Sequence, residues 1–367
     1  MFSAAGANLM NAVSKTAARQ FSTSGGVSKK PVVAIAGSTG AVGQELLDLI
    51  KERSFPFADI KLLASARSAG KTQDFMGKTY TVEELKEDSF EGVDIAFFSA
   101  GGGRSKQFAP AAAKAGAVVI DNSSAYRMDP EVPLVVPEVN PDAAFDRPKG
   151  IIANPNCSTI IMNMVVWPLH QKAGVERVVV STYQAASGAG AAAMEELEQQ
   201  AKDWVAEKSP VTQDIFGRQY IFNLFSHNSD VDQETGYNEE ETKMIKETKK
   251  IFSDPNIQVT ATCIRVPVLR AHCESINVTL KNSMTEDEAR ELLANSPGVS
   301  VQDDRVANKF PEPLASSFKD DCFVGRIRHD VSQPEGKGLD MFVAGDQIRK
   351  GAALNAIQIA ELLMSRS

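Results

Sequence analysis

The segment Pro31-Val32-Val33-Ala34-Ile35-Ala36-Gly37-Ser38-Thr39-Gly40-Ala41-Val42-Gly43 predicts the architecture of the first half of this chain. Residues 31–36 are apolar and predict a buried strand, and the glycine-rich segment 37–43 leads into a predicted helix over 44–51. Glycines in such a loop let the backbone turn tightly and approach a pyrophosphate, which binds at the helix N-terminus. The spacing is GxxGxxG rather than the commoner GxGxxG, so it is the strand–loop–helix order that favours a dinucleotide-binding site.

The alternation of strand and helix continues after this segment. Residues 93–98 predict a strand, a three-glycine turn at 101–103 starts a helix that reaches Lys114, and residues 117–120 predict the next strand. Strands that alternate with helices form a parallel sheet with helices on its faces. We therefore expect an α/β fold of the Rossmann type, with a doubly wound parallel sheet, in this half of the chain.

The second half has a different pattern. Predicted strands lie close together at 257–268 and 273–281, and Thr285-Glu286-Asp287-Glu288 is a capping box for a helix. Strands grouped in this way indicate a mixed α+β domain. A final amphipathic helix over 352–364 is expected to pack back on the first domain.

The loop Ser65-Ala66-Arg67-Ser68 follows the second predicted strand, 60–64. Folds that prefer NAD usually place an acid near this point for the ribose 2′-hydroxyl, and this loop has none. Its hydroxyl groups and the Arg67 guanidinium suit a 2′-phosphate, so the sequence predicts NADP as the cofactor. A solvated loop with an ordinary arginine is the alternative.

Composition excludes several classes of function. With 43% hydrophobic and 23% charged residues, the 367-residue chain has the composition of a soluble globular protein and the length of two domains. No apolar run is long enough to span a membrane, and the formal net charge of −8 argues against bulk nucleic-acid binding. The four cysteines, Cys157, Cys263, Cys273 and Cys322, form no CxxC pair, which indicates a reducing compartment and no metal site.

Residues 1–30 differ from the rest of the chain. Their only charges are Lys15, Arg19, Lys29 and Lys30, and serine, alanine and threonine are abundant. A basic, serine-rich and acid-free N-terminal segment is typical of an organelle transit peptide. We therefore expect import into a mitochondrion or a plastid, with a disordered tail or a start-site artefact as the alternative.

Asn154-Pro155-Asn156-Cys157-Ser158-Thr159 places a cysteine at the start of a predicted helix. Pro155 and Asn156 suit the turn and the cap before it, and Pro168 is expected to kink the helix or end it early. A thiol at a helix N-terminus faces free N–H groups and the positive end of the helix dipole, which both favour the reactive thiolate. A buried structural cysteine is the alternative.

A cysteine nucleophile needs a proton shuttle, and the chain has four histidines. His170 lies about three and a half helical turns beyond Cys157, too far to touch it. His227 and His329 lie in polar segments and are expected at the surface. His272, between two predicted strands, is the best remaining candidate.

Cations for an anionic substrate are less clear from the residues alone. Arg127 follows hydroxyl and amide side chains, a setting that suits an oxyanion. Arg265 lies on an apolar strand, where an inward-facing guanidinium needs a partner such as a substrate carboxylate, although an outward-facing arginine is equally compatible. Lys243 lies in a charged segment of a kind that is usually only solvated.

Together these motifs resemble the aspartate-β-semialdehyde dehydrogenase family in its bacterial-like form. The resemblance implies NADPH-dependent reductive dephosphorylation of L-4-aspartyl phosphate to L-aspartate 4-semialdehyde through a cysteine thioester, in the biosynthesis of lysine, threonine, methionine and isoleucine. It also implies a homodimer or homotetramer. The matching stretches follow the family's order and are Gly37–Gly43, Ser123–Arg127, Leu134–Asn140, Asn154–Thr159, Gln184–Gly190, Asn238–Lys250, Arg265–Glu274 and Gly345–Gly351.

The resemblance implies a role for each matching residue. Cys157 would be the nucleophile, His272 the general acid/base, and Gln184 would orient the thioester. The substrate-binding residues would be Arg127 and Lys243 for phosphate, Arg265 for the carboxylate and Glu240 for the ammonium group. The cofactor-binding residues would be Gly37, Ser38, Thr39, Gly40, Ala41, Val42, Gly43, Ser65, Ala66, Arg67, Ser68, Ser187, Gly188 and Gln347.

Three positions, in two places along the chain, depart from the family's pattern. The family usually reads Gly-His-Ser-Glu where this chain has Ala271-His272-Cys273-Glu274, and it usually has Asn where this chain has Gln347. A backbone with positive φ at Ala271 would cost a residue other than glycine about 1 kcal/mol or more.

We expect four segments: a transit peptide over 1–30, an NADP-binding domain over 31–156, a catalytic and dimerisation domain over 157–346, and a C-terminal helix over 347–367 that completes the NADP-binding domain. Another acyl-phosphate reductase of the same fold, such as the N-acetylglutamyl-phosphate reductase type, is the nearest alternative, and glyceraldehyde-phosphate dehydrogenase shares the same cysteine–histidine pairing. Glu240 and Lys243 favour a free amino acid, because an acetylated one offers no ammonium group. A non-catalytic NADP-binding protein is expected to have lost the cysteine or the histidine.

Overall fold

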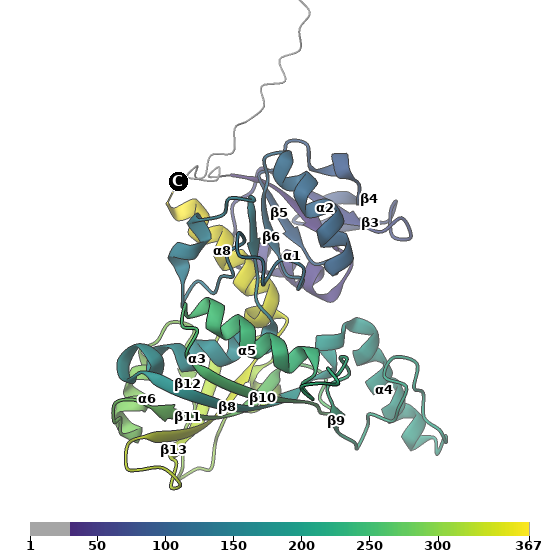
Figure 1. Cartoon of the computed structure of the whole chain (residues 1–367). Helices are drawn as coiled ribbons and strands as arrows, with labels where there is room; N and C mark the ends of the chain where they lie inside the picture. The colour runs from purple at the N-terminus through teal and green to yellow at the C-terminus, as the bar shows by residue number, and fades with distance from the viewer. Residues whose placement is uncertain (1–29, 367) are drawn as a thin grey trace, which may run out of the picture.

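Two seven-stranded sheets form the protein, one in each half of the molecule, as the computed structural model shows for the described residues 30–366 (Figure 1). The first sheet lies in the upper part of Figure 1 and the second in the lower part. The last helix, α8 (Leu354–Ser365), returns to the first sheet. The expected transit peptide lies, apart from Lys30, outside the described residues.

The first sheet has the strand order β3-β4-β2-β1-β5-β6-β7. Its neighbouring strands are parallel except in the β3–β4 hairpin at one edge. The chain crosses to either side of β1, which confirms the predicted doubly wound sheet. The strands are β1 Val32–Ala36, β2 Asp59–Ala64, β3 Thr72–Phe75, β4 Lys78–Glu84, β5 Ile95–Phe98, β6 Val118–Asp121 and β7 Ile151–Ala153.

Three helices cover this sheet. Helices α1 (Ala41–Glu52) and α8 pack on one face in a hydrophobic cluster that contains Ile35 and Ile357. Helix α2 (Gly102–Lys114) packs on the other face. A single π-helical turn, Arg349–Ala353, leads into α8.

The second sheet has the order β12-β13-β14-β11-β8-β10-β9. Strand β8 is parallel to β10 and antiparallel to β11, so the sheet is mixed, as predicted for this half. Its strands are β8 Val175–Gln184, β9 Phe225–Ser226, β10 Gln258–Arg265, β11 His272–Leu280, β12 Val299–Val301, β13 Cys322–His329 and β14 Gly338–Gly345.

Helices α3 and α5 lie between the second sheet and the upper half of the molecule (Figure 1). The capping box predicted at Thr285 is confirmed, because its side chain accepts from Glu288 N–H at the start of α6. The helices of this half are α3 Cys157–Ala173, α4 Ala191–Val205, α5 Glu239–Ile251, α6 Glu286–Ala294 and α7 Pro313–Ser316. Short 3₁₀ turns lie at Glu87–Phe90 and Pro141–Phe145 in the first half and at Ala186–Ala189 in the second.

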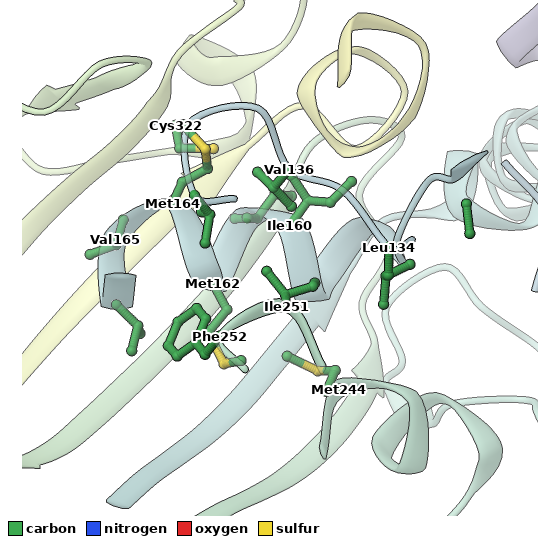
Figure 2. Packing of buried hydrophobic residues seen from close by; sticks show 14 of the residues in the cluster. Leu134, Val136, Ile160, Met162, Met164, Val165, Met244, Ile251, Phe252 and Cys322 are labelled. Atoms are coloured by element: carbon green, nitrogen blue, oxygen red, sulfur yellow. The ribbon is translucent and has the colours of Figure 1, made fainter. Parts of the chain in front are cut away.

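One hydrophobic core joins the two halves. Figure 2 shows Ile160 and Met162 of α3 near Ile251 of α5, and the same cluster extends to Phe98 on the first sheet. Burial of one such side chain contributes about 1.5–3 kcal/mol. This shared core fixes the N-terminus of α3 at the junction of the two halves.

Pro168 does not end α3 early, because the helix continues to Ala173. The expected early end is therefore wrong, and the expected kink stays a prediction. Its first ten residues after Cys157 are nearly all buried. Packing on several sides outweighs the roughly 3 kcal/mol that an internal proline costs. Within residues 30–366, no helix is long and apolar enough to cross a membrane, and no group of three His, Cys, Asp or Glu side chains could hold a metal ion.

Candidate active site

The N-terminus of α3 carries Cys157 as its first residue. Asn156 caps the helix, because its Oδ1 accepts from the N–H groups of Ser158 at 3.0 Å and Thr159 at 3.2 Å. The side chain of Asn156 therefore uses helix N–H groups that the sequence argument left free for the thiol. Its Nδ2 donates to Glu240 Oε1 at 2.8 Å, which links the cap to α5.

Cys157 lines a cavity of about 340 Å³ between the two halves of the molecule. Residues from α3, β8, α5, β10, β11 and the π-helical turn meet there. The cavity brings together all seven of the predicted catalytic and substrate-binding residues. The predicted residues that line it are Val42, Arg127, Cys157, Gln184, Ser187, Gly188, Glu240, Lys243, Arg265, His272 and Gln347.

The environment of Cys157 does not match the prediction of a thiolate in the free protein. Burial, together with the negative charge of Glu240, raises the pKa of the thiol to about 12. Arg265 and Arg127 act in the opposite direction but are outweighed. Cys157 is therefore protonated at neutral pH, because loss of solvation exceeds the effect of the helix N-terminus.

The carboxylate of Glu240 contacts three other side chains at the cavity. Its Oε1 accepts from Asn156 Nδ2 and from Gln184 Nε2 at 3.0 Å, and its Oε2 lies 3.3 Å from Lys243 Nζ. Burial alone would raise its pKa, but His227, Lys243 and these two hydrogen bonds outweigh that effect and hold it at about 2. A fixed negative charge therefore lies beside Cys157.

His272 is buried and has a defined tautomer. The N–H of Ala185 donates to its Nδ1 at 3.0 Å, so Nδ1 is unprotonated and the neutral ring carries its hydrogen on Nε2. That Nε2 is buried without a hydrogen-bond partner among the described residues. Burial and the charge of Arg265 lower the pKa of His272 well below its usual range, so the ring is neutral. It can donate a hydrogen bond into the cavity.

Gly188 is required by close packing. A Cβ atom at this position would lie 2.9 Å from Arg265 Nη1 and 3.0 Å from His272 Nε2. Any side chain would therefore displace one of these two groups, which both line the cavity.

Ala271 has a φ of 71°, the left-handed conformation in which glycine is favoured. Its N–H donates to Gln347 Oε1 at 2.9 Å, and Gln347 Nε2 donates to Ser187 Oγ. Both ends of the Gln347 amide thus hold backbone and side chains around His272. The predicted cofactor contact of Gln347 stays a prediction.

Arg127 is buried and paired with Glu247, a residue that the sequence argument missed. Arg127 Nη1 lies 3.1 Å from Glu247 Oε1, and Glu247 Oε2 accepts from the N–H of Asn156 at 2.7 Å. Glu247 lies two turns after Glu240 on α5, a helical spacing that could have identified it. The pair connects the predicted phosphate site to the cap of α3.

Arg265 makes three hydrogen bonds to neutral acceptors. They are Asn228 Oδ1 at 3.1 Å, Ala185 O at 3.0 Å and His227 Nε2 at 2.9 Å. The surface position expected for His227 is wrong, since its ring lines the cavity. It lies next to Arg265 because β9 pairs with β10, a long-range contact that local polarity does not reveal.

A second cavity of about 200 Å³ lies at the glycine loop. Its lining includes Arg67 and Arg104, no acidic side chain, and the predicted residues Gly37, Thr39, Gly40, Ser65 and Ser68. Gly37 has a φ of 95°, and α1 begins after Gly40 with no side-chain cap, so no N-cap side chain occupies the first N–H groups of the helix. The predicted residues that line neither cavity are Ser38, Ala41, Gly43 and Ala66.

The positions of Ser38 and Gly43 have a structural explanation. Ser38 is fully buried and its Oγ donates to Leu63 O at 3.3 Å. A Cβ at Gly43 would lie 2.3 Å from Gly37 O, so this glycine lets α1 pack against the loop. Ser38 and Gly43 therefore shape the loop by packing and do not line the cavity.

Comparisons with known proteins agree with one another. Residues 32–146 match the family described as semialdehyde dehydrogenase, NAD binding domain, and residues 166–350 match semialdehyde dehydrogenase, dimerisation domain. The aspartate-semialdehyde dehydrogenase of Synechocystis is 53% identical over 91% of this chain and 97% of its own. That of Aquifex aeolicus is 55% identical over 90% and 97%, respectively. A crystal structure of aspartate semialdehyde dehydrogenase II from Vibrio cholerae, complexed with ASA, has a TM-score of 0.88 at 43% identity, covering 92% of this chain and 99% of that one.

The predicted import into a mitochondrion or a plastid is wrong. The relatives that match 90–91% of this chain are bacterial proteins, including that of Bacillus subtilis, and no comparison supports organelle targeting or a transit peptide. That prediction rests on the composition of residues 1–30 alone, and a short basic, acid-free segment is not specific to import.

Proposed function

The chain belongs to the aspartate-semialdehyde dehydrogenase family, and on that basis we propose that Cys157 carries the substrate as a thioester. The reaction is the NADPH-dependent reduction of L-4-aspartyl phosphate to L-aspartate 4-semialdehyde with release of phosphate. The observation that carries the residue assignment is the position of Cys157. It starts a helix in a cavity between the two halves, facing Glu240, Arg265 and His272.

Cys157 Sγ attacks the carbonyl carbon of the acyl phosphate. The new S–C bond forms as the bond from that carbon to the phosphate oxygen breaks, and phosphate leaves with the proton of the thiol. A proton acceptor on the leaving group suits a thiol whose pKa is raised to about 12, because no free thiolate has to exist before the substrate binds. Arg127 and Lys243 line the same cavity and supply positive charge for the phosphate.

His272 supports the donating half of acid/base chemistry. Its Nε2–H faces the cavity, while Nδ1 is occupied by Ala185 N–H. A neutral imidazole donor stabilises the negative charge that develops on the substrate carbonyl oxygen during attack and reduction. Gln184 Nε2 lies against Ser158 Oγ at 2.7 Å and Glu240, which places its amide beside Cys157 for orienting the acyl group.

Arg265 and Glu240 suit the two charged groups of a free amino acid. The buried guanidinium of Arg265 has only neutral protein acceptors, so its charge is available to a substrate carboxylate. The ionised Glu240 is available to the substrate ammonium. The acetylated substrate of an N-acetylglutamyl-phosphate reductase has no ammonium group, so this pair favours aspartyl phosphate.

The glycine loop fits a dinucleotide. The positive φ of Gly37 and the uncapped start of α1 leave backbone N–H groups for a pyrophosphate. Arg67 and Arg104 at the neighbouring cavity, with no acid beside them, favour a 2′-phosphate, so we assign NADP rather than NAD. When bound, NADPH supplies the hydride that reduces the acyl group.

We also propose a homodimer or homotetramer, because residues 166–350 match a dimerisation domain. The division of the described residues at 156/157 and 346/347 is likewise a proposal. It is supported by the packing of α8 on α1 in the first half.

Assay of Cys157→Ala tests the nucleophile. We expect loss of turnover in the phosphorylating direction, with aspartate semialdehyde, phosphate and NADP as substrates, and NADP binding within about twofold of wild type. Measurable acyl transfer by the variant would contradict the assignment. If the wild-type protein preferred another aldehyde, the substrate assignment would be wrong.

A further inference from the structure

His227 is a second histidine in the cavity that the mechanism above does not use. It follows β9, in which Phe225 pairs with Arg265 of β10. The N–H of His227 donates to Cys263 O at 2.9 Å, which ties the start of the next segment to the same edge strand. The imidazole therefore lies beside Arg265 through backbone pairing, and it lines the cavity that contains Cys157.

The hydrogen bonds of Arg265 leave part of its guanidinium free for substrate. A guanidinium has five N–H groups and no acceptor. Nε donates to Asn228, Nη1 to Ala185 O and Nη2 to His227. One N–H therefore remains on each terminal nitrogen, and these two N–H groups are available to the oxygens of a carboxylate.

The tautomer of His227 follows from the same contact. Arg265 Nη2 can only donate, so His227 Nε2 accepts at 2.9 Å and the hydrogen of the neutral ring is on Nδ1. Nδ1 lies 3.0 Å from Ser229 Oγ, which can accept its hydrogen, and 3.2 Å from Ser229 N, whose N–H is directed at the same nitrogen and competes with that hydrogen. Burial, aided by Arg265 and Lys243, lowers the pKa of His227 to about 4 against the effect of Glu240, so the ring is neutral.

A neutral acceptor at this place has a specific consequence. A carboxylate at position 227 would form an ion pair with Arg265 and compete with the substrate carboxylate. An apolar side chain would leave a buried guanidinium N–H without a partner, and the Arg265 side chain would lose one of the contacts that fix its orientation. An imidazole holds the nitrogen in place without adding a negative charge in contact with the guanidinium.

The same segment also contacts the group proposed for the ammonium. Ser229 Oγ, the partner of His227 Nδ1, accepts from the backbone N–H of Glu240 at 3.3 Å. Residues 227–229 thus connect Arg265 with the first turn of α5. The positions of the two charged groups that face the substrate are coupled through this segment.

We propose that His227 is a positioning residue that sets the specificity for an α-amino acid. Its neutral imidazole holds the Arg265 guanidinium in the orientation that binds the substrate carboxylate. The inference rests on the proposed role of Arg265, and it adds a residue that acts through Arg265 rather than on the reacting atoms.

Two variants of His227 distinguish a role as hydrogen-bond acceptor from a role in packing alone. Gln places an amide oxygen near the position of Nε2, so His227→Gln keeps an acceptor, while His227→Leu fills the space without one. We expect His227→Leu to raise KM for aspartate semialdehyde roughly tenfold or more, the usual scale for one hydrogen bond to a charged group. Its kcat and its KM for NADP and phosphate should stay within about threefold. His227→Gln should stay within about threefold of wild type in every parameter.

An amino aldehyde without the carboxylate, 3-aminopropanal, serves as the control substrate. Wild type and His227→Leu should oxidise it with similar kcat/KM, because the interaction lost in the variant is one that this substrate does not make. His329→Leu, a histidine outside both cavities, is the control for loss of a histidine.

A double-mutant cycle completes the test. In an Arg265→Ala background, His227→Leu should cause no further rise in KM for the semialdehyde, because the group it positions is gone. Equal losses in His227→Gln and His227→Leu, a change confined to kcat, or additive effects in the cycle would overturn the inference. Failure of the proposed function would look different, since wild type itself would then fail to oxidise aspartate semialdehyde.

Discussion

The two cavities are built by opposite means. The cavity at the glycine loop is formed largely by backbone and by exposed Arg67. The cavity at Cys157 is formed by buried charged groups, among them Arg127, Glu240 and Arg265, each held by several partners. The difference teaches where each site is vulnerable. Removing a buried charge leaves its partner unpaired in the interior, whereas removing an exposed one affects the ligand alone.

The largest expected effect comes from Arg127→Ala. The variant leaves Glu247 buried without its cation, and we expect the free energy of unfolding to fall by about 3–5 kcal/mol. Denaturation in urea measures this change. The double variant Arg127→Ala/Glu247→Gln should recover part of the loss, and a loss below about 1 kcal/mol in the single variant would show that the pair is not a buried ion pair.

Glu240 gives a pH-dependent effect of intermediate size. Its pKa of about 2 in the folded protein lies below its ordinary value of 4.5, so its contribution to stability is complete above pH 4.5 and is lost as the pH falls toward 2. Between pH 6 and pH 3.5 we expect the stability difference between wild type and Glu240→Gln to shift by about 1–2 kcal/mol against wild type. Urea denaturation at both pH values measures it. A difference that is independent of pH would contradict the fixed charge of Glu240.

Arg67→Ala probes the cofactor cavity, and its effect should be on the ligand. We expect KM for NADP to rise roughly tenfold, since one hydrogen-bonded ion pair to phosphate is lost, and KM for NAD to be unchanged. The unfolding free energy should stay within about 0.5 kcal/mol of wild type, because Arg67 is exposed. Equal effects on NADP and NAD would rule out a contact with the 2′-phosphate.

Ala271→Gly is expected to have the smallest effect. The left-handed backbone at Ala271 strains a residue with a Cβ atom, so glycine should raise the free energy of unfolding by about 0.5–1 kcal/mol. Thermal or urea denaturation measures it. A destabilised variant would mean that the Cβ packing of this buried residue outweighs its strain.

The contrast between the cavities also explains what the sequence could predict. Strand β1, the glycine loop and α1 are continuous in sequence, so their order and the Rossmann-type sheet follow from local pattern. The sequence analysis does not predict the mostly exposed β3–β4 hairpin, although Tyr80 and Val82 alternate with polar residues along β4.

The Cys157 cavity depends on contacts across the chain. The helical spacing of Glu247 from Glu240 places both on one face of α5, but its contact with the cap of α3 depends on packing across the chain. His227 looks like an ordinary polar-loop residue in sequence, and only the β9–β10 pairing brings it to the site. The helix position of Cys157 is visible in the sequence, but its burial, which raises the pKa of the thiol, depends on the folded structure. Ala185 contributes through its backbone alone, so no sequence motif could reveal it.

Mass spectrometry of the protein mixed with aspartate semialdehyde and NADP, without phosphate, tests the central claim most directly. Oxidation of the bound semialdehyde should leave an aspartyl thioester on the peptide that contains Cys157, and later addition of phosphate should remove it. An unmodified Cys157 under these conditions, or an acyl group on Cys263, Cys273 or Cys322 instead, would contradict the account.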